Sequence, residues 1–211
     1  MAFGAVCISS EDGAAAAEAS ALVADALGFR LINEDIVARA AVDAGVDVDI
    51  VADVERRRST LIKLLESLGP ASMAAGAVVM VPEDWGYGRP SSHELRALIR
   101  SVIEDTATEG NVVIVAHAAS LALAERDDVL RVLITASPTT RQRRVAASLG
   151  VDQNEAARIL KRSDVGRADY IKRFYGVDDE RPTHYDLVIN TDRLSPDDAA
   201  RLIVGAANGS K

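Results

Sequence analysis

Four short apolar segments constrain the fold of this chain more than any other feature. They are rich in Val, Ile and Leu and cover residues 5–9, 112–115, 129–135 and 187–190. Runs this short and this β-branched are typical of parallel strands that are buried on both faces. Because helical patterns separate them, we predict an α/β fold in which helices flank a parallel sheet and ligands bind at the carboxyl ends of the strands.

Helical patterns and their stop signals divide the rest of the chain. The expected helices cover residues 14–27, 33–44, 49–67 and 92–109. Gly28, Gly45 and Gly110 follow three of them, and glycine is the residue that most often ends a helix. Residues 71–90 are predicted to be loop and short segments, in which Trp85 and Tyr87 more plausibly cover the core than stack on a base. A chain of 211 residues fits one folding unit.

Composition excludes several classes of protein. The formal net charge of -8 argues against a general nucleic-acid surface, because phosphate-backbone binding rests on an excess of Lys and Arg. Cys7 is the sole cysteine, which rules out an internal disulfide, and three scattered histidines do not suggest a metal cluster. No apolar run approaches the length of a membrane span, and the N-terminus lacks the basic start of a secretory signal, so we expect a cytoplasmic protein without a membrane partner.

Two distant segments together suggest phosphoryl chemistry. The first strand runs into Ser10-Glu11-Asp12-Gly13 and an alanine-rich helix, which is the layout of a phosphate-binding strand, loop and helix. The second is the arginine-rich run from Lys161 to Tyr170. With the segments 110–115, 129–132 and 185–191, their order along nearly the whole chain resembles the cytidylate kinase-like family.

This resemblance implies the nucleoside monophosphate kinase fold. That is a P-loop kinase-like, three-layer α/β architecture in one domain over residues 1–211, with an acceptor-side insertion at about 33–110 and a lid segment at about 140–180. The implied activity is transfer of a phosphoryl group from ATP, with Mg²⁺, to a nucleoside monophosphate such as CMP.

The resemblance also places the phosphate loop at residues 11–18. Gly13 keeps a glycine of the pattern. The final glycine position falls on Ala16, the cationic position on Ala17 and the Ser or Thr position on Glu18. Losing the cation removes a charge contact with phosphate, and the acidic residues before Gly13 repel an arriving phosphate. The free amides at the helix N-terminus still favour an anion.

Four arginines match the lid of the family: Arg141, Arg144, Arg162 and Arg167. Guanidinium groups suit phosphate oxygens because they donate two parallel charge-assisted hydrogen bonds. By the resemblance, Arg162, Arg167 and Arg144 would act on the transferred phosphoryl group and Arg141 would contact the nucleotide. The alternative, a solvated basic face paired with nearby carboxylates such as Asp164, stays equally open.

The acceptor side departs from the family pattern. Where the family usually has Gly-Arg-Gly after a strand, this chain has Ala116-His117-Ala118, and Asn33 stands where the family commonly has Asp. His117 and Asn33 are therefore the candidate acceptor contacts. Each also has a purely structural explanation, a satisfied histidine at a strand end and a helix cap respectively.

Two hypotheses about function follow. The first is a cytidylate kinase-like phosphotransferase with a degenerate phosphate loop and weak or lost catalysis. The second is a kinase-dead module that senses a nucleotide or binds a protein partner, for which residues 78–89 are the candidate surface.

Overall fold

The computed structural model describes residues 3–32, 92–116 and 118–209. Helices predicted over 33–44 and 49–67, and the loop predicted over 71–90, lie outside the described residues. The described elements are β1 (Ala5–Ser10), α1 (Ala16–Leu27), β2 (Arg30–Ile32), α5 (Ser92–Glu109), β3 (Val112–Val115), α6 (Ala119–Ala122), β4 (Val129–Thr135), α7 (Pro138–Leu149), α8 (Gln153–Tyr175), the 3-10 turn η1 (Pro182–His184), β5 (Leu187–Asn190) and α9 (Pro196–Ala207).

The described strands form one parallel sheet in the order β2-β3-β1-β4-β5. In its centre, β1 pairs with β3 from Ala5 opposite Val112 and with β4 from Ala5 opposite Val129. Each of the four predicted apolar segments is a strand of this sheet. The carboxyl end of β1 therefore lies between those of β3 and β4.

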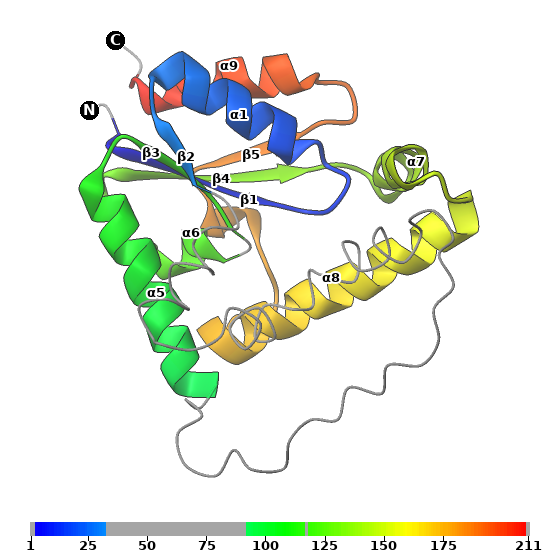
Figure 1. The fold of residues 1–211 in the computed structure, drawn as a ribbon, viewed down its shortest axis with the longest axis horizontal. Helices are drawn as coiled ribbons and strands as arrows, with labels where there is room; N and C mark the ends of the chain where they lie inside the picture. Colours follow the sequence, from blue (N-terminus) through cyan, green and yellow to red (C-terminus); the bar gives the residue numbers. More distant parts are fainter. Residues whose placement is uncertain (1–2, 33–91, 117, 210–211) are drawn as a thin grey trace, which may run out of the picture.

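Helices cover both faces of the sheet, which gives three layers (Figure 1). Helices α1 and α9 pack on one face, and α5 and α6 lie on the other. Along β1, Val6 and Ile8 belong to the core under α1 and α9, whereas Ala5 and Cys7 belong to the core on the opposite face. This alternation explains why the central strand is apolar from Ala5 to Ile8; the buried residue that follows, Ser9, is polar. The predicted α/β fold class is confirmed.

The turn between β1 and α1 differs in detail from the sequence prediction. Strand β1 continues to Ser10, and α1 begins at Ala16 rather than at residue 14. Gly13 and Ala15 have φ angles of 81° and 61°, in the left-handed region, so the chain cannot be α-helical there. The amide of Ala14 instead donates to the carbonyl of Glu11, which closes a tight turn ahead of the helix.

Helices α7 and α8 form a hairpin with a small apolar cluster of its own. Val145 and Ala146 of α7 pack with Ala156, Ile159 and Leu160 of α8. Ser137 caps α7 and Asp152 caps α8, each by accepting an amide hydrogen bond. Both helices lie in the segment predicted as a lid, and α8 runs past the loop that follows β1 (Figure 1).

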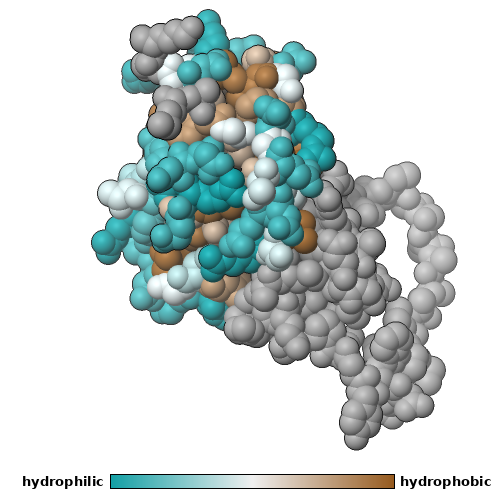
Figure 2. Space-filling view, turned by 90° about the vertical axis from the view of Figure 1, so that its left-hand side faces the viewer, coloured by the Kyte–Doolittle hydropathy of each residue, from teal (hydrophilic) through white to brown (hydrophobic). Residues whose placement is uncertain are grey.

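Hydrophilic residues cover most of the described surface on the side shown in Figure 2. The large apolar side chains that are exposed among the described residues lie on four different elements: Leu22 on α1, Val165 on α8, Val188 on β5 and Leu202 on α9. Within the described part of the chain, no helix is both long enough and apolar enough to span a bilayer.

Gly13 is predicted to be the most sensitive of the glycines in the described part of the chain. A Cβ at this position would lie 2.8 Å from the carbonyl oxygen of Arg141, in addition to the strain of a positive φ. Gly13→Ala should therefore lower the free energy of unfolding by about 2–4 kcal/mol in urea titrations. The matched control is Gly150→Ala, because Gly150 has a φ of 64° but nothing within 4 Å of its Cβ position. It should cost about 1–2 kcal/mol, and equal losses in the two variants would contradict the steric explanation.

Candidate functional site

The loop after β1 borders a pocket of about 560 Å³. One wall is the continuous stretch from Ser10 to Glu18, which includes the predicted site residues Gly13, Ala16, Ala17 and Glu18. The other described lining residues are Val115, Arg144, Ala147 and Pro196. The pocket thus lies at the carboxyl end of the sheet and extends toward α7 and α9, as expected for an open α/β fold.

The N-terminus of α1 is one end of this pocket. Its N-cap residue is Ala15, and no side chain caps the helix there. The first amides of an α-helix have no partner within the helix, and they carry a partial positive charge. Ala17 and Glu18 are exposed in this first turn. The arrangement can hold an anion through backbone amides, although no cationic side chain stands in this turn.

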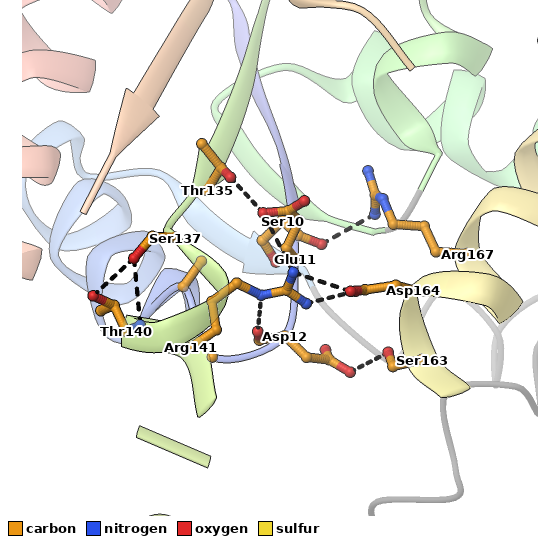
Figure 3. A network of polar contacts seen from close by, with 12 residues as sticks. Ser10, Glu11, Asp12, Thr135, Ser137, Thr140, Arg141, Ser163, Asp164 and Arg167 are labelled. Carbon is orange, nitrogen blue, oxygen red and sulfur yellow. Dashed lines mark hydrogen bonds and ion pairs between the residues drawn. The ribbon is translucent and has the colours of Figure 1, made fainter. Parts of the chain in front are cut away.

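Three arginines hold the loop by its backbone. Arg167 donates to the carbonyl of Ser10 at 3.0 Å, Arg141 to that of Asp12 at 2.7 Å and Arg144 to that of Gly13 at 3.2 Å. Figure 3 shows Arg141 and Arg167 reaching the loop from α7 and α8. Because the peptide unit is planar and trans, fixing each carbonyl also fixes the direction of the next amide. The arginines therefore set the shape of the loop.

Arg141 is also neutralised by carboxylates. Its Nη1 and Nη2 atoms donate to the two carboxylate oxygens of Asp164 at 3.2 and 2.5 Å, and its Nη1 lies 3.7 Å from an oxygen of Glu11. The side chain of Arg141 is only 4% exposed. A guanidinium buried this deeply needs such partners, since an unpaired buried charge is strongly unfavourable.

Arg144 is tied to the strand at the edge of the sheet. It donates to both the hydroxyl and the carbonyl of Thr191, at 2.9 and 2.7 Å. The Thr191 hydroxyl in turn donates to the carbonyl of Ala14 at 2.9 Å. Thr191 is 1% exposed, so this pair joins the loop to the end of β5 in the protein interior.

Arg167 sits in a buried polar cluster with Glu180 and Tyr185. Its Nε donates to Glu180 at 2.9 Å, and the Tyr185 hydroxyl also donates to Glu180. Burial alone would raise the pKa of Glu180, but the hydrogen bond and charge of Arg167 outweigh burial and hold that pKa below its usual value. Burial and the Glu180 charge raise the pKa of Tyr185. Glu180 is therefore ionised and Tyr185 neutral near pH 7.

The carboxylates of the loop are engaged as well. Glu11 accepts a hydrogen bond from the hydroxyl of Thr135, and Asp12 accepts one from the hydroxyl of Ser163 (Figure 3). No group of three or more His, Cys, Asp or Glu side chains arranged to hold a metal is found among residues 3–32, 92–116 and 118–209. Glu18 is the exposed carboxylate of the first turn of α1 and borders the pocket.

Arg162 is placed differently from the other predicted arginines. Its guanidinium lies 3.4 Å from Glu155 of the same helix, and its side chain is 55% exposed. The structure thus brings Arg141, Arg144 and Arg167 to the loop, whereas Arg162 contacts Glu155 of its own helix. The predicted acceptor contacts Asn33 and His117 lie outside the described residues.

Residues 5–193 match the family described as "Cytidylate kinase-like family". This chain belongs to the cytidylate kinase-like family. A cytidylate kinase of Pyrobaculum arsenaticum is 33% identical over 115 residues, which are 54% of this chain and 61% of that protein. A cytidylate kinase of Ignicoccus hospitalis is 32% identical over 151 residues, or 66% of this chain and 86% of that protein. The chain spans about three fifths of the length of the first curated relatives it matches.

A solved structure shares the fold of this chain. An uncharacterized protein from Eubacterium ventriosum superimposes with a TM-score of 0.66 at 15% identity, and the match covers 97% of this chain and 98% of that one. At this identity the likeness concerns the fold alone. The described core of this family member is therefore shared with a solved structure over almost the entire chain.

Sequence reasoning missed three residues that organise the site: Thr191, Glu180 and Tyr185. Thr191 and Tyr185 stand within the segment that carried the family resemblance, but their positions gave no sign of a contact with the loop. Glu180 lies in an irregular stretch after α8. A buried arginine requires an acidic partner, yet only the tertiary structure identifies which of many carboxylates it is.

The Glu180 contact predicts a specific acid sensitivity. Because its native pKa is depressed, the stability that Glu180 contributes is fully present above its unfolded-state value near 4.5 and is lost as pH falls through the native value. Urea unfolding between pH 7 and pH 3 should show a steeper loss for the wild type than for Glu180→Gln, which should also be about 3–5 kcal/mol less stable at pH 7. The exposed-site control, Asp197→Asn, should follow the wild-type curve. Parallel curves for wild type and Glu180→Gln would refute the assignment.

Proposed function

We propose that this member of the cytidylate kinase-like family binds a nucleotide in the pocket of loop Ser10–Glu18 and transfers phosphoryl groups weakly or not at all. The proposed ligand is ATP with Mg²⁺, and the proposed acceptor is CMP or a related monophosphate. The relatives named cytidylate kinase support this class of ligand. The departures of the loop from the family pattern support the reduced activity.

This proposal depends on the charges of the side chains that line the pocket. Its described lining contains three carboxylates, those of Glu11, Asp12 and Glu18, and one cationic side chain, Arg144. Arg144 is already engaged by Gly13 and Thr191. A phosphoryl group in transfer carries charge that must be neutralised by donors aimed at it, and this term is usually the largest in catalysis. Amides at the start of α1 favour binding of a phosphate, but they do not replace a mobile cation.

Magnesium fits this pocket with only a small number of ligands from the protein. Mg²⁺ is held mainly by nucleotide phosphates and water, with one or two carboxylates from the protein. Glu18, exposed at the first turn of α1, is the residue proposed to hold it, directly or through water. When bound, the ion would offset part of the negative charge that the loop carboxylates present to a triphosphate.

The remaining parts of the proposal concern the two flanking segments. The acceptor-side insertion, about residues 33–110, with Asn33 and His117 would receive the monophosphate, and the lid, about residues 140–180, would cover the phosphates with Arg141, Arg144 and Arg167. A kinase-dead module that senses a nucleotide is the limiting case of the same site. The alternative hypothesis, a kinase-dead module that binds a protein partner, rests on residues 78–89, which lie outside the described residues.

Nucleotide titration tests binding and catalysis separately. In calorimetry with Mg²⁺, ATP should bind with a measurable dissociation constant, and a ligand at 100 times that constant should add about 2.7 kcal/mol to the free energy of unfolding. Coupled assays with ATP and CMP should show little or no turnover. Absence of heat and of a melting shift at millimolar ATP and CMP would reject the proposed function, whereas rapid turnover would reject its catalytic part.

A cation restored to the loop should strengthen triphosphate binding. Ala17 is exposed, borders the pocket and occupies the cationic position of the family pattern. Ala17→Lys should tighten ATP binding about tenfold or more, because a charge-assisted hydrogen bond contributes about 1.5–3 kcal/mol. Ala17→Met supplies a flexible side chain without the charge and should leave the affinity near that of the wild type. An equal change in both variants would show that the phosphates lie elsewhere.

A further inference from the structure

The guanidinium of Arg141 has the donors to bind an anion, but a carboxylate of the same chain already occupies them. Asp164 binds it with both carboxylate oxygens, one on Nη1 and one on Nη2. This two-point geometry is the same one by which arginine binds two oxygens of a phosphate. The remaining guanidinium nitrogen, Nε, donates to the carbonyl of Asp12. As the site stands, an incoming phosphate has no free edge of Arg141 to bind.

The two members of this ion pair differ in how firmly they are held. The Arg141 side chain is 4% exposed and the Asp164 side chain is 46% exposed. The backbone of Arg141 packs against Gly13, and its Nε is fixed by the loop. Asp164 lies on α8, and nearly half of its side chain is exposed to solvent. Displacing Asp164 would therefore leave the guanidinium in place and uncovered.

The uncovered edge would lie beside the phosphate loop. Arg141 contacts the loop at Asp12 and lies 3.7 Å from Glu11, and both of these residues line the pocket. Ser163, the neighbour of Asp164, bonds the Asp12 carboxylate, so α8 and the loop meet at this point (Figure 3). A phosphate on the uncovered edge would therefore lie next to residues of the loop that also line the pocket.

We propose that Asp164 is an internal competitor for polyphosphate: its carboxylate occupies the edge of Arg141 that a phosphate group would take, and its withdrawal opens an anion site at the loop. This inference rests on the proposed function, which places the phosphates at the loop. It adds that the site is masked by the chain itself. The ligand class is a polyphosphate anion, either as the tail of a nucleotide or as the free ion.

Inorganic tripolyphosphate measures this site without the rest of a nucleotide. Calorimetry at one fixed, low salt concentration would compare wild type, Asp164→Asn and the charge-matched control Asp178→Asn. Asp178 forms an exposed ion pair with Lys172 and is absent from the lining of the pocket. Asp164→Asn should bind tripolyphosphate about tenfold tighter or more than Asp178→Asn, because one charge-assisted pair is gained. Equal affinities in the two variants would overturn the proposal.

Two further measurements test whether the gain in tripolyphosphate affinity comes from the guanidinium of Arg141. Asp164→Asn leaves a buried guanidinium underneutralised, so its melting temperature should fall below that of the wild type and should recover when tripolyphosphate is added. An unstable variant that tripolyphosphate does not rescue would contradict the proposal. In the double variant Asp164→Asn with Arg141→Gln, the gain in affinity should vanish, and a gain that persists would assign the anion to another group.

Parallel titrations with ATP and CMP separate this inference from the proposed function. A wild-type protein that binds neither nucleotide, together with a gain for tripolyphosphate in Asp164→Asn, would reject the proposed function and support the masked site. Binding of ATP by the wild type, with equal tripolyphosphate affinities in Asp164→Asn and Asp178→Asn, would support the proposed function and reject the masked site. A gain for ATP as well as tripolyphosphate would identify the nucleotide tail as the ligand, and a gain for tripolyphosphate alone would identify the free ion.

Discussion

The arginine contacts with the backbone of the loop are the constraint on which the rest of the site depends. Arg167, Arg141 and Arg144 bind the carbonyls of Ser10, Asp12 and Gly13. These contacts orient the peptide planes between β1 and α1 and hold the α7–α8 hairpin close to the sheet. The loop keeps its shape because cations from outside it bind its carbonyls, in a turn where two residues already have positive φ.

The same contacts show where the charge of these arginines is directed. The described arginines at the loop bind backbone carbonyls and the carboxylates of Asp164 and Glu180. Buried cations need partners whether or not a ligand is present. Carboxylates that meet this need stabilise the unliganded protein, and they compete with phosphate for the same donors.

The family and the parallel α/β class were accessible from the sequence because they follow from local patterns, whereas the strand order and strand β2 were not predicted. The strands at 112–115, 129–135 and 187–190 were predicted with the bounds that the structure has, since buried parallel strands read as short apolar runs. The start of α1 was predicted two residues early, because alanines favour a helix and the sequence does not reveal the left-handed backbone of Ala15. Here the turn overrides the local preference.

The sequence by itself determined four of the strands and their order along the chain, the position of the loop and the number of arginines in the lid segment. Each of these follows from residue type and spacing along the chain. The tertiary structure alone decided which partner each arginine has: Arg162 lies against Glu155, whereas Arg141 crosses to Asp12 and Asp164. Which charges pair depends on the distance between them and on how deeply they are buried. Residues far apart in sequence come close enough to pair only because the sheet and the hairpin bring them together.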